Sequence, residues 1–218
     1  LSDKARVDFI VHAPQQYTVV ANGALVSVKK RKKIKTFHYS AMVPIPTKVM
    51  VVGIAQFSMD LAGIVNGTLV QSFTYPENKE AAGKDLSLAP DILDFYISYI
   101  APYEFEKLDN VQSTTRFGGM ENAGCIFYDE DALNGTKSAE SLIAHEIVHQ
   151  WFGNSATEKD WPHLWLSEGF ATYLTNIYIE KTKGDLAFKT QLEQDRKKVV
   201  NFDKRYHHPV VDLSLIHI

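Results

Sequence analysis

SAESLIAHEIVHQWFG, residues 138–153, is the stretch that decides how this chain folds. Its apolar side chains recur all round a helix, and a helix that is apolar on every side is buried. Its main polar exceptions, His145, Glu146 and His149, fall together, and they would be costly in a protein core without a partner. We expect this helix to begin at an N-cap formed by Ser138 and to stop at Gly153.

The spacing of the two histidines favours a metal site. His145 and His149 stand four positions apart, so they lie one turn apart on the same helix face and can hold one metal ion. Glu146, beside them, is placed to accept a proton from a water that the metal activates. Two histidines that merely share a helix give the same motif, but their setting in an apolar helix favours a metal as the partner.

A third metal ligand comes from the next apolar stretch. A helix is expected from about Pro162 to Lys183, ended by Gly184, and Glu168 lies in it among apolar neighbours. Catalytic zinc takes three protein ligands and keeps one open position. We therefore expect one Zn²⁺ per chain, held by His145, His149 and Glu168; the alternative for Glu168 is a carboxylate that is solvated or paired with a buried base. The core-facing stripe of this helix is expected to comprise Trp165, Leu166, Phe170, Tyr173, Leu174, Ile177 and Tyr178. A last helix, near residues 185–202, is interpreted as scaffold.

The N-terminal part of the chain has the pattern of strands. Residues 1 to about 70 alternate apolar and polar positions, with turn signals at Asn22-Gly23 and Asn66-Gly67, which predicts an antiparallel sheet region. The basic run at residues 29–35, KKRKKIK, sits between two strand-like stretches. It is interpreted as the exposed tip of a hairpin rather than a patch that binds polyanions. A helix that starts at Pro90 and strands at 111–117 and 125–128 are expected to follow.

Composition limits the classes of partner. The chain has 218 residues, 45% hydrophobic and 22% charged, and its formal net charge of −3 gives no reason to expect nucleic acid as a partner. Cys125 is the only cysteine, which excludes an intrachain disulfide and a cysteine-based zinc site. No run of eighteen apolar residues predicts a membrane segment in this chain. Its abrupt ends predict a fragment of a longer protein, and the sequence does not indicate a compartment.

Two motifs together resemble a known family. HEIVHQWFGN with WLSEGFATY is similar to the zinc signature of the aminopeptidase N family of zinc metallopeptidases, and GGMEN at 118–122 is similar to that family's exopeptidase motif. The resemblance implies an α+β fold in two parts. Residues 1–71 would be the C-terminal part of an N-terminal antiparallel β domain. Residues 72–218 would be a thermolysin-like, mainly α-helical zinc catalytic domain, incomplete at its C-terminal end.

The same resemblance implies a zinc-dependent aminopeptidase that acts on peptides with a free N-terminus. Glu121 would bind the substrate's α-amino group, and an ammonium group in a closed pocket does need an anionic partner. Gly118, Gly119, Met120 and Asn122 would line the path of the substrate, since glycines let another backbone approach closely. Without the resemblance, GGMENAG is only a flexible loop.

Three other functions remain as alternatives. A bifunctional epoxide hydrolase and aminopeptidase, like the leukotriene enzyme, belongs to the same family. A zinc-binding but inactive fragment or interaction module would have no need of Glu146, and a zinc endopeptidase would have no need of Glu121. The family's oxyanion-stabilising tyrosine would lie beyond residue 218, so we expect the chain on its own to be weakly active or inactive.

Overall fold

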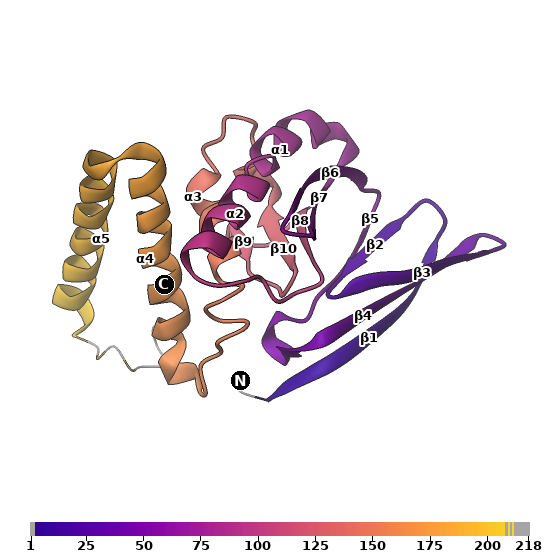
Figure 1. The fold of residues 1–218 in the computed structure, drawn as a ribbon, viewed down its shortest axis with the longest axis horizontal. Coiled ribbons are helices and arrows are strands. Elements are labelled where there is room, and N and C mark those ends of the chain that lie inside the picture. The colour runs from indigo at the N-terminus through magenta and orange to yellow at the C-terminus, as the bar shows by residue number, and fades with distance from the viewer. Residues whose placement is uncertain (1–2, 208, 210, 212–218) are drawn as a thin grey trace.

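The computed structural model describes residues 3–207, 209 and 211, and its arrangement of strands and helices confirms the α+β class. A three-stranded sheet lies at one end of the molecule, two long helices lie at the other, and a five-stranded sheet with three helices lies between them (Figure 1). The strands are β1 Lys4–Pro14, β2 Thr18–Ala21, β3 Ala24–Arg31, β4 Ile34–Pro46, β5 Val52–Ala55, β6 Ser58–Val65, β7 Thr68–Thr74, β8 Lys107–Ser113, β9 Gly119–Met120 and β10 Cys125–Asp129. The helices are α1 Lys79–Leu86, α2 Ala89–Tyr99, α3 Glu140–Val148, α4 Leu164–Lys183 and α5 Asp185–Tyr206, with short 3₁₀ turns at Thr47–Val49, Pro76–Asn78, Glu130–Ala132 and Trp161–His163.

The N-terminal strands build two small antiparallel sheets, ordered β1-β4-β3 and β2-β5. Alternate residues of β4, such as Phe37 and Tyr39, are buried against Val19, as the period of two predicted. Strands β3 and β4 join through Lys32 and Lys33, and Lys32 has a φ of 54°. This two-residue turn confirms that the basic run is an exposed hairpin tip.

The central sheet has the order β6-β7-β8-β10-β9. Strands β7, β8 and β10 run parallel to one another, whereas β6 and β9 are antiparallel edge strands. The prediction of an antiparallel region up to about residue 70 is confirmed for the hairpin of β6 and β7, but β7 also pairs in parallel with β8, because an alternating pattern does not reveal every partner of a strand. The Asn66-Gly67 hairpin is confirmed, with φ values of 47° and 85°. The expected domain boundary between residues 71 and 72 falls inside β7 and stays a prediction.

Helices α1 and α2 cover one side of the core. The sequence pattern does not predict helix α1, because its segment, KEAAGKDL, is short and largely polar. Helix α2 begins with Pro90 in its first turn, as predicted. The fully buried side chains of this core cluster include Leu86, Ile92, Leu93, Tyr96, Leu108, Ile126, Ile143 and Ile147.

Helix α3 is shorter than expected at both ends. It begins at Glu140, and Ser138 gives no cap: its hydroxyl lies 2.9 Å from that of Thr136 instead. At the other end the chain leaves the helix after Val148 and makes tight turns, with Gln150 N–H donating to the Ile147 carbonyl. Gly153, with a φ of 120°, lies in these turns rather than at the helix end.

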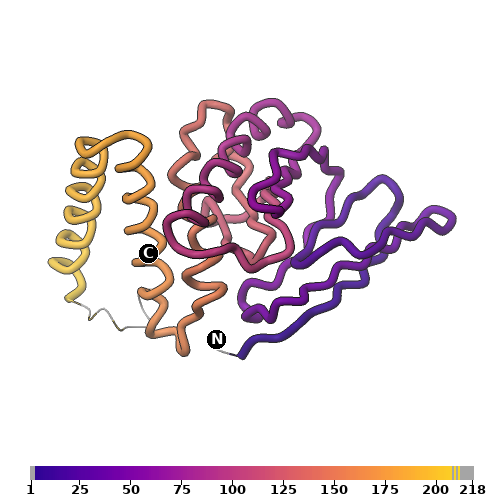
Figure 2. Tube along the Cα trace, in the orientation of Figure 1, coloured from indigo at the N-terminus to yellow at the C-terminus, as the bar shows by residue number. Residues whose placement is uncertain are grey.

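Helices α4 and α5 form an antiparallel pair at the edge of the molecule (Figure 2). Gly184 ends α4 as predicted, with a φ of 83°. The expected apolar stripe was only partly correct: Leu174, Ile177 and Tyr178 are buried. Trp165, Phe170 and Tyr173 are exposed. No described residue of α5 is buried, and no helix among the described residues is both long enough and apolar enough to cross a membrane.

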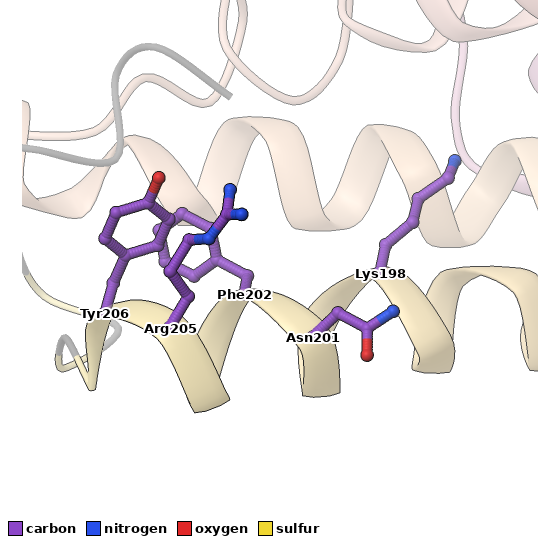
Figure 3. Close-up of a pocket in the computed structure, with 5 residues that line it drawn as sticks. All are labelled: Lys198, Asn201, Phe202, Arg205 and Tyr206. Carbon is purple, nitrogen blue, oxygen red and sulfur yellow. The ribbon is translucent and has the colours of Figure 1, made fainter.

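A shallow depression lies on α5, where aromatic, polar and basic side chains meet (Figure 3). Its lining residues are Lys198, Asn201, Phe202, Arg205 and Tyr206. They include no acidic side chain and no histidine, so this depression offers no group that could bind a metal or activate water.

Candidate metal centre

The structure brings the three expected metal ligands together. His145 and His149 place their Nε2 atoms 3.0 Å apart, and one oxygen of Glu168 lies 3.4 Å from the first and 3.5 Å from the second. Helix α3 and the residue that follows it supply the histidines, and α4 supplies the glutamate. This is the one group of three such ligands found among the described residues.

These separations fit a tetrahedral metal. Zinc bonds of about 2.0–2.2 Å place any two ligand atoms of a tetrahedron about 3.3–3.6 Å apart. Both histidine–glutamate distances fall in this range, and the two nitrogens are only slightly closer. Two imidazoles and one carboxylate are also the donor types that zinc prefers.

His149 is held so that its metal-facing nitrogen is free to coordinate. Its ring is buried, and Nδ1 donates to the carbonyl of Phe152 at 2.9 Å. The hydroxyl of Ser167 lies 3.2 Å from the same nitrogen and donates to the same carbonyl. In the neutral ring, a proton on Nδ1 that is donated to this carbonyl leaves the lone pair of Nε2 for a metal. Such outer contacts fix the tautomer and the ring direction of metal-binding histidines.

The electrostatics of the cluster reflect an excess of negative charge. Burial lowers the pKa of His149, but the hydrogen bond to Glu168 and the charges of Glu121 and Glu146 outweigh it and raise that pKa to about 9. For Glu168, burial raises the pKa, but hydrogen bonds with His145 and His149 outweigh it and hold the pKa far below its usual value. The group is therefore arranged to attract a cation.

Glu146 faces the same region from inside the core, with 5% of its surface exposed. Burial raises its pKa to about 8; the charges of Glu121 and Glu168 add to this, and His149 opposes it. A carboxylate whose pKa lies near neutrality is suited to taking up and releasing a proton.

The glycine-rich segment packs directly against Glu146. Strand β9, formed by Gly119 and Met120, pairs with β10 and leaves its other edge outside the sheet. A Cβ atom on Gly119 would lie 2.3 Å from a carboxylate oxygen of Glu146, so only glycine fits there. Gly118 has a φ of 77°, which also favours glycine.

Glu121 follows β9 and is nearly buried. Its charge raises the pKa of both Glu146 and His149, which places its carboxylate on the same region as the metal ligands. Asn122 is buried next to it and donates to the carbonyl of Met120 at 3.4 Å. The segment that carries Glu121 and Asn122 thus joins the turn after α3 through the Glu121 carbonyl, which accepts hydrogen bonds from Gln150 and Asn154.

Three residues of this region were not predicted from the sequence: Gln150, Asn154 and Ser167. Gln150 and Asn154 both donate to the backbone carbonyl of Glu121, and Ser167 supports His149. The signal for them was present, because all three lie inside the two segments that carry the ligands, HEIVHQWFGN and WLSEGFATY. A sequence motif alone, however, does not show whether an amide side chain is buried and hydrogen-bonded or exposed to solvent.

The geometry is that of a group that could hold one metal ion, with two histidines from an HExxH segment, a glutamate from a second helix and a glycine-rich edge strand nearby. Comparison with known proteins then gives the family. A model described as the peptidase family M1 domain matches residues 85–214, and the chain belongs to this family. The match confirms the resemblance to the aminopeptidase N family that the two motifs indicated.

Curated relatives agree with this assignment. The chain is 33% identical to aminopeptidase M1-A of Oryza sativa subsp. japonica over 188 residues, which cover 81% of this chain and 21% of that protein. It is 28% identical to glutamyl aminopeptidase of Rattus norvegicus over 225 residues, covering 95% of this chain and 24% of that protein. The chain therefore spans about a quarter of the length of the relatives it matches.

Proposed function

We propose that the protein containing this chain is a zinc-dependent aminopeptidase that hydrolyses N-terminal residues from peptides. The observation that carries the proposal is the meeting of three carboxylates, Glu121, Glu146 and Glu168, beside two histidines. Among residues 3–207, neither Glu121 nor Glu146 pairs with a lysine or an arginine. A buried carboxylate without a cation is costly, so the site calls for positive charge from outside.

Two positive groups would supply that charge. A divalent metal and one substrate ammonium would both offset the negative charge that the carboxylates bring to this region. The metal would be held by His145, His149 and Glu168, and the ammonium by Glu121. Family membership agrees with both assignments, because peptidases act on peptides and the curated relatives are named aminopeptidases.

In the proposed mechanism, each residue acts on a bound peptide with a free N-terminus. Bound zinc would polarise the scissile carbonyl and activate the attacking water. Glu146 accepts the proton of that water and then passes it to the leaving amine. Glu121 binds the α-ammonium group and so places the first peptide bond at the metal. The free edge of β9 pairs with the substrate backbone, and Gly119 lets the side chain of Glu146 pack directly against this strand.

The fold assignment that goes with this function is also a proposal. Residues 72–218 would form the first part of a thermolysin-like catalytic domain, and residues 1–71 the end of a β domain that precedes it. No feature of the described residues favours the alternative of an epoxide hydrolase. An inactive zinc-binding module would leave the buried Glu146 without a purpose.

Zinc content is the first test. The purified chain should bind about one zinc ion, and His149→Ala should abolish binding because it removes the buried ligand. A folded chain that binds no zinc would mean either that the motif is coincidental or that further segments complete the site. The longer natural protein, measured in the same way, separates these two explanations.

The substrate class needs a second test, made on the full-length protein. Peptides with a free N-terminus should be cleaved, whereas N-acetylated versions of the same peptides should not, because acetylation removes the charge that Glu121 binds. Equal cleavage of both would exclude the role of Glu121 and leave an endopeptidase.

A further inference from the structure

The turn that follows α3, residues 149–154, makes hydrogen bonds to the loop that carries Glu121. Asn154 Nδ2 donates to the Glu121 carbonyl at 2.7 Å, and Gln150 Nε2 donates to the same oxygen at 3.1 Å. Gln150 also accepts a hydrogen bond from the backbone N–H of Gly124 through Oε1, at 2.8 Å. Both amide side chains are 1% exposed. The backbone of Glu121 is therefore fixed from one side by two buried donors.

The same turn also orients a metal ligand. Its Phe152 carbonyl accepts the Nδ1 proton of His149, and Asn154 N–H closes the turn on the His149 carbonyl at 3.2 Å. Gly153 is required here, since a Cβ atom would lie 2.5 Å from the hydroxyl of Ser167. One short turn thus sets the direction of His149 and the position of Glu121 at once.

The loop is held from the opposite side as well, but farther from the metal ligands. Asn22 donates to the Ala123 carbonyl at 2.8 Å, and Lys107 donates to the Gly124 carbonyl at 3.3 Å. Neither contact involves Glu121 itself. Among the described residues, the side-chain hydrogen bonds that join the backbone of Glu121 to the end of α3 come from the turn after this helix.

The chemistry of Asn154 shows which of its atoms matters. Its Oδ1 is buried and has no hydrogen-bond partner among the described residues, whereas its NH₂ group donates to Glu121. A buried amide oxygen without a partner is unfavourable for the fold. The favourable contact that the Asn154 side chain makes is therefore the one through its NH₂ group.

We infer that Asn154, together with Gln150, is a positioning residue for substrate selection: it sets the distance between the amine anchor and the metal. This inference rests on the proposed role of Glu121. It predicts that loss of the donor weakens recognition of a substrate's amino group while leaving metal binding intact, because a shift on the order of 1 Å at such an anchor can change rates by about 10².

The test uses two zinc-binding ligands that differ only in the α-amino group, alanine hydroxamate and propionohydroxamic acid. Their inhibition constants are measured on the zinc-loaded, full-length protein. The natural protein should favour the amino-bearing ligand by about 10- to 100-fold, the range that a charge-assisted contact provides. In Asn154→Leu this ratio should fall about tenfold, with zinc content and the constant for propionohydroxamic acid unchanged. Asn201→Leu, an exposed change on α5, is the matched control and should behave as the natural protein does.

Two further variants keep the test decisive. Asn154→Asp keeps the shape of the side chain if Asn154→Leu fails to fold, and Gln150→Met removes the second donor; each should lower the same ratio. A folded, zinc-loaded Asn154 variant with an unchanged ratio would overturn the inference, as would an equal loss of affinity for both ligands. A natural protein with no preference for the amine, and no change in Glu121→Gln, would instead refute the proposed function on which the inference rests.

Discussion

The two helices that supply metal ligands are held in different ways. Helix α3 lies inside the core, and the side chain of His149 is only 2% exposed, with its outer nitrogen bonded to the chain. Helix α4 has one buried side and one open side, and the side chain of Glu168, on the open side, is 49% exposed. The proposed zinc site therefore has a buried half, the histidines at the end of α3, which core packing holds in place. Its open half is Glu168, which lies on the exposed side of α4.

This difference separates two tasks that a metal site performs. In the proposed site, the buried half would determine where the metal and the general base lie, because His149 and Glu146 cannot move without disturbing the core. The open half completes the charge balance and can adjust its distance to the ion. Mutations on the two sides should consequently affect catalysis, folding and metal binding in different proportions.

The largest effect is expected inside the buried half, at Glu146. Glu146→Gln keeps the shape of the side chain but cannot accept a proton, so kcat of the full-length protein should fall by on the order of 10²–10⁴. Zinc content, measured on the same sample, should not change, because Glu146 is not a ligand. Turnover within a few-fold of the natural protein would exclude Glu146 as the general base.

The core around α3 should be the most sensitive to loss of packing. Ile143 is fully buried, and Ile143→Ala should lower the free energy of unfolding of residues 1–218 by about 2–5 kcal/mol. Denaturant unfolding of the metal-free chain measures this directly. A loss below about 1 kcal/mol would mean that α3 is not part of a packed core.

The two kinds of ligand should differ in their effect on folding. His149→Ala leaves the Phe152 carbonyl with fewer donors and opens a cavity, so the metal-free chain should lose about 1–3 kcal/mol of stability. Glu168→Ala should cost less than about 1 kcal/mol, since its carboxylate is half exposed. Both variants should lose zinc. Equal destabilisation by the two variants would contradict the division into a buried and an open half.

The smallest effect is expected on α5. Leu186 is 80% exposed, and Leu186→Ala in residues 1–218 should change stability by no more than about 0.5 kcal/mol. The comparison with Ile143→Ala uses the same measurement and a similar loss of side-chain volume. A large effect would show that Leu186 is covered in solution.

The ligand cluster could be predicted from the sequence because its signal is local. The two histidines stand four positions apart in an apolar helix, and the next helix carries an acid. These features were enough to predict that His145, His149 and Glu168 lie together. The end of α4 was equally predictable, since Gly184 adopts a backbone conformation that favours glycine.

Other features depend on partners that a single segment does not reveal. Apolar residues on α4 gave the right helix but not its buried face, because the pattern does not show which side has a neighbour. Helix α3 ends early, and the turn after it makes hydrogen bonds with the Nδ1 atom of His149 and the carbonyl of Glu121. These contacts form only in the folded chain, so no local sequence pattern reveals them. The parallel pairing of β7 with β8 joins segments about thirty-eight positions apart, Leu69 with Lys107, and no local pattern specifies it.

The order of the central sheet has a consequence for how the protein can be divided. Strand β8 lies between β7 and β10, so a cut after residue 71 would remove the β7 residues that pair with Lys107, Leu108 and Asp109. This part of β8 would then present open backbone groups next to the buried Leu108, which makes it a template for pairing with a second molecule. A shortened chain that starts at residue 72 should therefore self-associate, whereas one that starts before β6, at residue 57, should keep the edge covered and stay dispersed.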